Sequence, residues 1–372
     1  MNDLFSNFPT ADVSALPTPV VRLSNLGHDR LFMKCDNLSG ETYGGNKIRK
    51  LDFLLGQALA EERRSVITYG AAGSNHALAT AVCCRQRGLK AISILAPQET
   101  NGHVRKNLLM QQAVGAELIL CPGFSDFPET TRQAVERCKQ TDGLEPYIIP
   151  AGGTNATGAL GFVNAALEMA GQIQPDVIYI PMGTGGTHAG LLVGLKLAGL
   201  NTRVEAVRVV EPEFRDRTHI QQLCDELCAK LEKGLQDQCG LLETEERKGR
   251  EADEFPLLRE LCDLGVEKNP RIEDSNIIIR DAFFGEGYGM STPEAEEAVR
   301  LFKEQENVYL ETTYTGKATA ALLHDLRTGA LDGQTVLYWN TLNSRDFSDE
   351  VAPIDFHTLP PDFHSYFSGE IV

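Results

Sequence analysis

The sequence lacks several features that mark membrane, secreted or nucleic-acid-binding proteins. No apolar run approaches the length of a membrane-spanning helix. The stretch from Met1 to Phe8 has neither a basic region nor a long apolar core, so we expect no signal peptide. Basic residues are a minority, with 35 Lys and Arg against 52 Asp and Glu, and a net charge of −17 is unfavourable for binding phosphate backbones. We therefore expect neither a membrane nor a nucleic-acid partner.

Clustered cysteines are also missing. The nine cysteines are odd in number and scattered, with no CxxC pair and no histidines gathered near them. Cys224 and Cys228 are four residues apart in a helical pattern, where metal binding is the weaker alternative to packing. These features predict a reduced, cytoplasmic protein without a metal site.

What is present is a regular alternation of strand and helix patterns in a chain long enough for two domains. The 372 residues are 42% hydrophobic and 23% charged, which is ordinary for a globular protein. Short β-branched runs such as residues 65–69 and 90–96 are each followed by a helical pattern. Such alternation predicts crossover connections and an α/β fold with mostly parallel sheets. Residues 308–311 are expected to form one of the later strands.

One segment, residues 211–275, departs from this alternation. It is acidic and helical in pattern around residues 220–235 and 256–264. A solvated helical insertion is the main interpretation, and a lid or partner surface is the alternative.

A lysine follows two glycines at a predicted helix start. Gly44 and Gly45 allow tight backbone geometry, and Asn46 and Lys47 come directly after them, before an apolar helical pattern. The helix dipole disfavours a cation at this end, so Lys47 is a candidate for chemistry. A solvated charge at a helix start remains the alternative.

A glycine-rich loop after a predicted strand is a second candidate site, and it consists of Gly183, Thr184, Gly185, Gly186 and Thr187. Glycines let successive backbone N–H groups point into one concavity, and the following helix start adds its positive end. The loop has neither the lysine of a nucleotide P-loop nor GxGxxG spacing. We expect it to hold a lone monophosphate, with a glycine-rich turn that binds nothing as the alternative.

Other polar residues follow predicted strands, and such junctions meet at the carboxyl edge of a parallel sheet. Ser74 and Asn75 could bind a ligand, or Ser74 could only cap a helix, and no G-x-S-x-G elbow surrounds it. Tyr288 lies between glycines and Tyr314 just ahead of a helix, where each could serve as acid or base or simply pack. A lysine, a monophosphate loop and polar strand-end residues together suggest pyridoxal phosphate, which needs an amine, an anion site and a partner for its ring nitrogen.

Five stretches in this order resemble the family of D-cysteine desulfhydrases and 1-aminocyclopropane-1-carboxylate (ACC) deaminases. They are GGNKIRKLDFLL, GSNHALATA, GTGGTHAGLLVGL, GYG and YTGKA, and the resemblance extends from about Pro17 to Thr341. It implies the tryptophan-synthase-β-like fold (fold type II) with two three-layer αβα domains. The large domain would comprise residues 1–51 and 161–372, the small domain residues 52–160, and the enzyme would be a homodimer.

The same resemblance implies roles for individual residues. Lys47 would form the Schiff base, Asn75 would bind the phenolic oxygen of the cofactor, and the loop from Gly183 to Thr187 would hold its phosphate. Ser74, Tyr288 and Tyr314 would face the substrate. Thr315 and Thr341 complete the implied cofactor site.

Two positions bear on the substrate. ACC deaminases carry glutamate where this chain has Thr315, and a neutral hydroxyl makes the cofactor ring a weaker electron sink that still suffices for β-elimination. The family shows a His-Thr-Gly-Gly motif where this chain has Asn340-Thr341-Leu342-Asn343. Thr315 thus favours elimination, while the altered loop leaves the substrate open.

We therefore expect a pyridoxal-phosphate lyase that catalyses α,β-elimination on a small amino acid, with D-cysteine giving pyruvate, sulfide and ammonia. The substrate amine would displace Lys47, and Lys47, Tyr288 or Tyr314 would remove the α-proton. The alternatives are ACC deamination, a dehydratase or β-replacement enzyme on serine-like substrates, and a non-catalytic ligand-binding protein.

Overall fold

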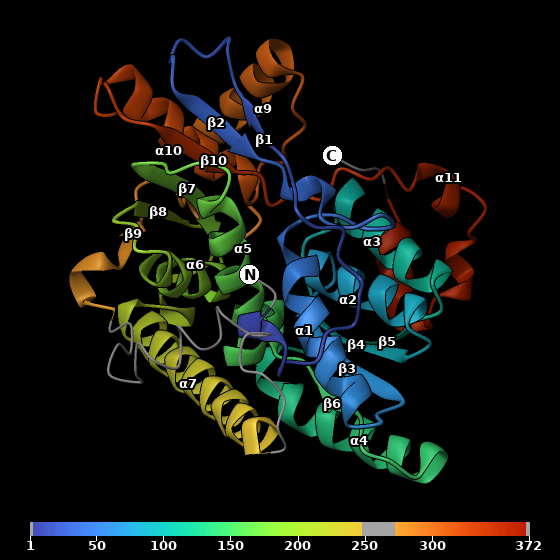
Figure 1. Ribbon diagram of the computed structural model, residues 1–372. Coiled ribbons are helices and arrows are strands. Elements are labelled where there is room, and N and C mark those ends of the chain that lie inside the picture. Colours follow the sequence, from blue (N-terminus) through green and yellow to red (C-terminus); the bar gives the residue numbers. More distant parts are fainter. Residues whose placement is uncertain (1–2, 248–271, 370–372) are drawn as a thin grey trace. The chain divides into compact units, whose positions relative to one another are not determined.

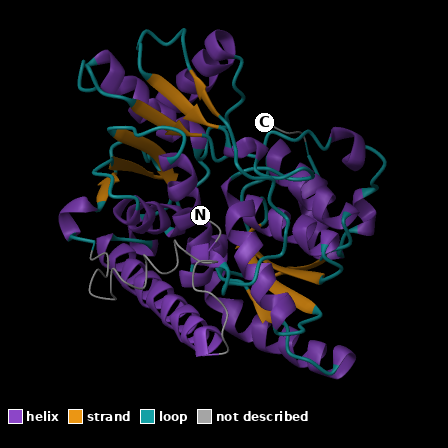
Figure 2. Ribbon diagram, viewed as in Figure 1, coloured by secondary structure: helices purple, strands orange, loops and turns teal. Residues whose placement is uncertain are grey.

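A computed structural model describes residues 3–247 and 272–369 of the chain. The chain divides into two compact units, and each contains one β-sheet flanked by helices (Figures 1 and 2). The first unit consists of Met1–Thr10, Pro17–Cys35 and Asn155–Thr341, and the second of Ala11–Leu16, Asp36–Thr154 and Leu342–Val372. The second unit thus takes in residues 36–51 and the C-terminal tail, which we expected in the large domain.

The sheet of the first unit has six strands in the order β1-β2-β10-β7-β8-β9. Only β1 runs antiparallel to its neighbour, and all other pairs are parallel. The strands are β1 (Val20–Arg22), β2 (Leu31–Lys34), β7 (Val177–Met182), β8 (Arg203–Arg208), β9 (Ile278–Arg280) and β10 (Val336–Trp339). Parallel strands need crossover helices, and helices lie on both faces of this sheet (Figure 1).

Those helices pack according to the alternation of side chains along the strands. Val177 and Tyr179 of β7 share a core with Phe302 and Ala321, which belong to the helices of one face. On the other face two helices approach so closely that a Cβ on Gly190 would lie 2.5 Å from Cβ of Phe162. The helices are α5 (Ala156–Ala170), α6 (Gly186–Leu197), α7 (Arg217–Arg247), α9 (Pro293–Glu306) and α10 (Thr315–Arg327).

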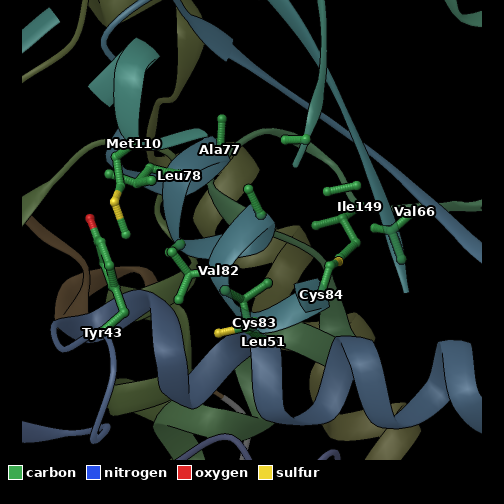
Figure 3. Packing of buried hydrophobic residues seen from close by; sticks show 14 of the residues in the cluster. Tyr43, Leu51, Val66, Ala77, Leu78, Val82, Cys83, Cys84, Met110 and Ile149 are labelled. Carbon is green, nitrogen blue, oxygen red and sulfur yellow. The ribbon is translucent and has the colours of Figure 1, made fainter. Parts of the chain in front are cut away.

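The sheet of the second unit has four parallel strands in the order β5-β4-β3-β6. The strands are β3 (Ser65–Ala71), β4 (Lys90–Ala96), β5 (Glu117–Leu120) and β6 (Tyr147–Ile148), and the helices are α1 (Asn46–Ala60), α2 (Asn75–Gln86), α3 (Gly102–Ala113), α4 (Phe127–Asp142) and α11 (Ser348–Val351). On one face Leu51 of α1, Val82 and Cys83 of α2 and Val66 of β3 belong to one buried cluster (Figure 3). The opposite face packs against α4.

The predicted α/β class with mostly parallel sheets is confirmed, and one predicted strand is not. The strand expected at residues 308–311 is wrong, because that segment forms no ladder and instead connects α9 to α10. The helix expected around residues 220–235 is part of α7, whereas the one around residues 256–264 lies outside the described residues. Among the described helices, none combines the length and apolar character needed to cross a membrane.

Candidate active site

The backbone ahead of Lys47 is shaped by the chain's own contacts. Gly45 has φ of 90°, a conformation that disfavours side chains, and a Cβ on Gly44 would lie 1.9 Å from the carbonyl oxygen of Asn37. Helix α1 begins at Asn46, so Lys47 lies in its first turn, and Lys47 Nζ donates to Asn46 Oδ1 over 2.9 Å. The contacts of Gly44 and Gly45 therefore fix the position of the helix start that contains Lys47.

A buried ion pair holds the preceding loop against α1. Arg49 donates from Nε and Nη2 to the two carboxylate oxygens of Asp36, each over 2.8 Å, and both side chains are fully buried. The Asp36 carbonyl also accepts from the Gly45 N–H over 2.7 Å. A bidentate pair of this kind fixes direction as well as distance, so the loop and Lys47 form one rigid segment.

The start of α2 presents Ser74 and Asn75. Ser74 Oγ accepts from the Ala77 N–H over 3.2 Å, so this serine does cap the helix, and its own hydroxyl proton remains to be donated. Asn107 of α3 donates from Nδ2 to Asn75 Oδ1 over 3.1 Å and to the Gly73 carbonyl over 2.8 Å. Because Asn75 Oδ1 is thereby occupied, its NH₂ group is the end available to donate to a ligand.

Two further buried bases lie near Lys47, and the sequence reasoning missed both. Lys50 Nζ donates to the Gly152 carbonyl over 3.2 Å, and burial followed by the charge of Lys47 lowers its pKa well below the usual range. His76 is 3% exposed, and burial with the charges of Lys47 and Lys50 lowers its pKa well below its usual value. Burial therefore disfavours the charged form of both groups. For Lys50 the sequence did contain a signal, because a lysine three residues after Lys47 lies on the same side of a helix that is buried nearly all round.

The predicted phosphate loop, in the first unit, joins β7 to α6. Gly185 has φ of 84°, and a Cβ there would lie 2.2 Å from Cδ1 of Ile220, so only glycine fits. Gly186 and Thr187 open α6 and present its first N–H groups. Arg215 donates to the Thr184 carbonyl over 3.2 Å, which brings a guanidinium to the loop. These donors and the positive helix end fit a single phosphate group.

Tyr288 and Tyr314 form a hydrogen-bonded pair in the same unit. Their hydroxyl oxygens are 2.6 Å apart, and their rings meet edge to face with centroids 6.0 Å apart. A Cβ on Gly183 would lie 3.8 Å from Cε1 of Tyr314, so the pair adjoins the phosphate loop. Burial raises the pKa of both phenols, and their hydrogen bond offsets part of the rise for Tyr288 but adds to it for Tyr314. Both are therefore neutral proton donors near neutral pH.

Thr315, the first residue of α10, is bound by a carboxylate that the sequence reasoning placed in a strand. Glu311 accepts from the N–H groups of Thr313, Tyr314 and Thr315 over 2.8, 2.9 and 2.7 Å. Thr315 Oγ1 lies 2.9 Å from Glu311 Oε1, and Thr315 is fully buried. An acidic residue just ahead of a helix start was the available signal for this role.

The altered loop after β10 contains a contact that accounts for one of its replaced glycines. Asn340 and Thr341 are buried at the end of the first unit. Asn343, which belongs to the second unit, accepts from the Gly44 N–H through Oδ1 over 2.8 Å. This side chain thus supports the backbone just ahead of Lys47, a task that a glycine could not perform.

Comparisons with known proteins identify the family of this chain. Residues 13–341 match the family model described as pyridoxal-phosphate dependent enzyme. The chain is 30% identical to the D-cysteine desulfhydrase of Yersinia enterocolitica, over 86% of this chain and 89% of that protein. It is 33% identical to a putative ACC deaminase of Pyrococcus furiosus, over 92% of this chain and 94% of that protein.

A solved structure gives the same result for the fold. The crystal structure of an ACC deaminase homologue superposes with a TM-score of 0.73 at 28% identity, and the match covers 94% of this chain and 97% of the other. The resemblance and the fold class expected from the sequence are thereby confirmed. The roles of individual site residues stay predictions.

Proposed function

Because the chain belongs to the family of pyridoxal-phosphate dependent enzymes, we propose that it is a lyase that eliminates a β-substituent from a small amino acid, with D-cysteine as the first candidate. The cofactor expected from the sequence is confirmed by that membership. The observation that carries the proposal is the pair formed by Tyr288 and Tyr314, whose hydroxyl oxygens are 2.6 Å apart beside the phosphate loop. Such a pair can deliver a proton to a leaving group.

Each unit by itself presents groups that suit one part of the cofactor. Lys47 would supply its amine, and the loop from Gly183 to Thr187 its phosphate site. The Asn75 NH₂ would bind the ring oxygen, Thr315 would face the ring nitrogen, and Thr341 would complete the site. When bound, pyridoxal phosphate supplies the electron sink that makes the α-proton of an amino acid removable.

The chain's own groups would then move two protons. The amine of Lys47, once displaced, takes the α-proton, and burial disfavours a charge on Lys50, one turn along α1. The departing sulfur keeps the electrons of the broken C–S bond and takes a proton from Tyr288, which Tyr314 supports. After uptake of one water the products are pyruvate, sulfide and ammonia. Proton transfer of this kind contributes about 10²–10⁴-fold to the rate.

Substrate orientation would come from the start of α2. The Ser74 hydroxyl retains a proton to donate, and the first N–H groups of the helix favour an anion such as a substrate carboxylate. Thr315 supports elimination over ACC deamination because its neutral hydroxyl leaves the ring a weaker sink. The similarity to the Pyrococcus protein keeps ACC deamination as the second candidate. A homodimer in the cytoplasm stays part of this proposal.

A keto-acid release screen tests the proposal. The purified holoenzyme is incubated with D- and L-cysteine, D- and L-serine, β-chloroalanine and ACC. Pyruvate together with sulfide from D-cysteine is expected. Release of 2-oxobutyrate from ACC would identify a deaminase instead, and turnover of serine with inert D-cysteine would identify a dehydratase.

A further inference from the structure

Lys317, two residues after the start of α10, is a fully buried lysine outside the predicted site. Its Nζ donates to the carbonyl oxygens of Phe284 and Gly287 over 2.5 and 3.2 Å and lies 5.0 Å from the centre of the Phe284 ring. Within the described part of the chain, its direct contacts are these two carbonyl oxygens and the Phe284 ring. Both carbonyls belong to the short segment that ends in Tyr288.

Two carboxylates hold the backbones of the two tyrosines on either side of this lysine. Glu211 accepts from the Tyr288 N–H over 3.1 Å, and Glu311 accepts from the Tyr314 N–H over 2.9 Å. The charges of Glu311 and Glu211 both act on Lys317 and offset part of the lowering of its pKa that burial causes. The buried cation therefore lies in the field of the two groups that fix the tyrosine backbones.

This place is an unfavourable one for a lysine on general grounds. Burial of an ammonium group that forms no ion pair costs free energy, and the positive end of a helix opposes a cation. An apolar residue would fill the same volume without either penalty. An apolar residue would not bind the carbonyls of Phe284 and Gly287, and among the described side chains it is Lys317 that donates to both.

We propose that Lys317 is a positioning residue, which holds the segment from Phe284 to Tyr288 against the first turn of α10 and thereby sets the hydrogen bond between Tyr288 and Tyr314. The segment is attached to α10 by Lys317 at Phe284 and Gly287, and Tyr314 directly precedes that helix. The Lys317 clamp thus joins the two halves of the tyrosine pair. This inference rests on the proposed function only in so far as the pair transfers a proton in catalysis.

Hydrogen exchange measured by mass spectrometry on the holoenzyme tests the clamp without any substrate. In Lys317→Met the amides of residues 283–290 are expected to exchange about tenfold faster, while those of α9 keep their rate. Lys317→Gln retains a donor for one carbonyl and should give an intermediate rate, which keeps the test open if the methionine variant folds poorly. The exposed Lys196→Met near the end of α6 is the matched control and should change nothing. Unchanged exchange in residues 283–290 would overturn the proposal.

A kinetic cycle tests whether the clamp acts through Tyr288. Lys317→Met is expected to lower kcat about tenfold with little change in KM, and to cause no further loss in the Tyr288→Phe background. If the double variant instead lost the product of the two single-variant decreases in kcat, Lys317 would not act through Tyr288, and the inference would be overturned. If the parent protein turns over no amino acid, the proposed function fails by itself, and the exchange result still decides whether the clamp exists.

Discussion

The carboxylate of Glu311 lies 2.9 Å from the hydroxyl of Thr315, at the start of the helix that carries the YTGKA stretch. A carboxylate is the strongest acceptor within reach of that hydroxyl, so the Thr315 proton is directed toward Glu311, while the hydroxyl oxygen accepts from the Glu311 N–H over 2.9 Å. Glu311 organises this part of the site although it is absent from the motif.

We expect Glu311→Ala to destabilise the protein because three N–H groups at the start of α10 and the Thr315 hydroxyl lose their acceptor. The free energy of unfolding should fall by about 1–2 kcal/mol, as for other lost helix caps. Denaturant titration monitored by circular dichroism measures it. Glu297→Ala, which removes an exposed carboxylate on α9, is the control and should have far less effect. Equal effects of the two substitutions would contradict the role given to Glu311.

Thr315→Glu should not convert the chain into an ACC deaminase. Position 315 is fully buried, and the new carboxylate would lie beside that of Glu311, so one of them would have to be protonated or displaced. We expect a loss of roughly 3 kcal/mol in the free energy of unfolding and no gain in 2-oxobutyrate release from ACC. Thr315→Ser keeps the hydroxyl and should behave like the parent. A stable glutamate variant that turns over ACC would refute this expectation.

Asn107→Ala should weaken cofactor binding through Asn75. The substitution removes the donor to Asn75 Oδ1 and to the Gly73 carbonyl, so the Asn75 amide is free to turn. Because Asn75 would lose the hydrogen bond that orients it, we expect the dissociation constant of pyridoxal phosphate to increase about tenfold. Absorbance titration of the cofactor-free protein gives that constant. Lys106→Ala, one residue earlier on α3 and exposed, should leave it unchanged, and the same weakening in both variants would argue against a specific role for Asn107.

How far the sequence alone could go is clearest at the start of α1. The pattern of glycines, Asn46 and Lys47 predicted a helix start and a reactive lysine, because such patterns are local. It did not show why position 44 must be glycine, which is that a Cβ there would lie 1.9 Å from the carbonyl oxygen of Asn37. Three-dimensional contacts of this kind cannot be predicted from the spacing of residues in the sequence.

Glu311 illustrates the same limit. Its neighbours Val308 and Tyr309 are typical of strands, and local propensity therefore predicted one. In the structure, Glu311 instead accepts hydrogen bonds from N–H groups at the start of α10. These N–H groups have no partner within the helix, and their need for an acceptor outweighs the local strand propensity. Asn107 and Lys317 could not be found at all from spacing, because each acts on a segment more than 25 residues away.

His188 should make stability depend on pH below about 6.5. Its ring is fully buried near the start of α6, and burial lowers its pKa to about 3. The unfolded chain takes up a proton as the pH falls through about 6.5, whereas the folded protein does so only near its lowered pKa, so stability is lost as the pH falls between these values. The loss is at most about 1.4 kcal/mol per pH unit.

The comparison that isolates this effect is between the parent protein and His188→Leu. The free energy of unfolding of the variant should fall less steeply from pH 6.5 to 4.5, while other acidic groups contribute equally to both proteins. A substitution of the exposed His219 to Gln serves as the control and should keep the slope of the parent. Parallel curves for the parent and His188→Leu would contradict the expected effect of burial.

The central claim is that Lys47 binds pyridoxal phosphate covalently, and the measurement that tests it most directly is the visible absorbance of the purified protein followed by borohydride reduction and peptide mass analysis. The parent should show an absorbance band near that of a lysine-bound cofactor, and reduction should attach the cofactor mass to the peptide that contains Lys47. Lys50→Met, one turn along α1, should retain the band, whereas Lys47→Ala should lose both the band and the labelled peptide. A band that persists in Lys47→Ala, or a label found on any other lysine of the parent, would contradict the claim.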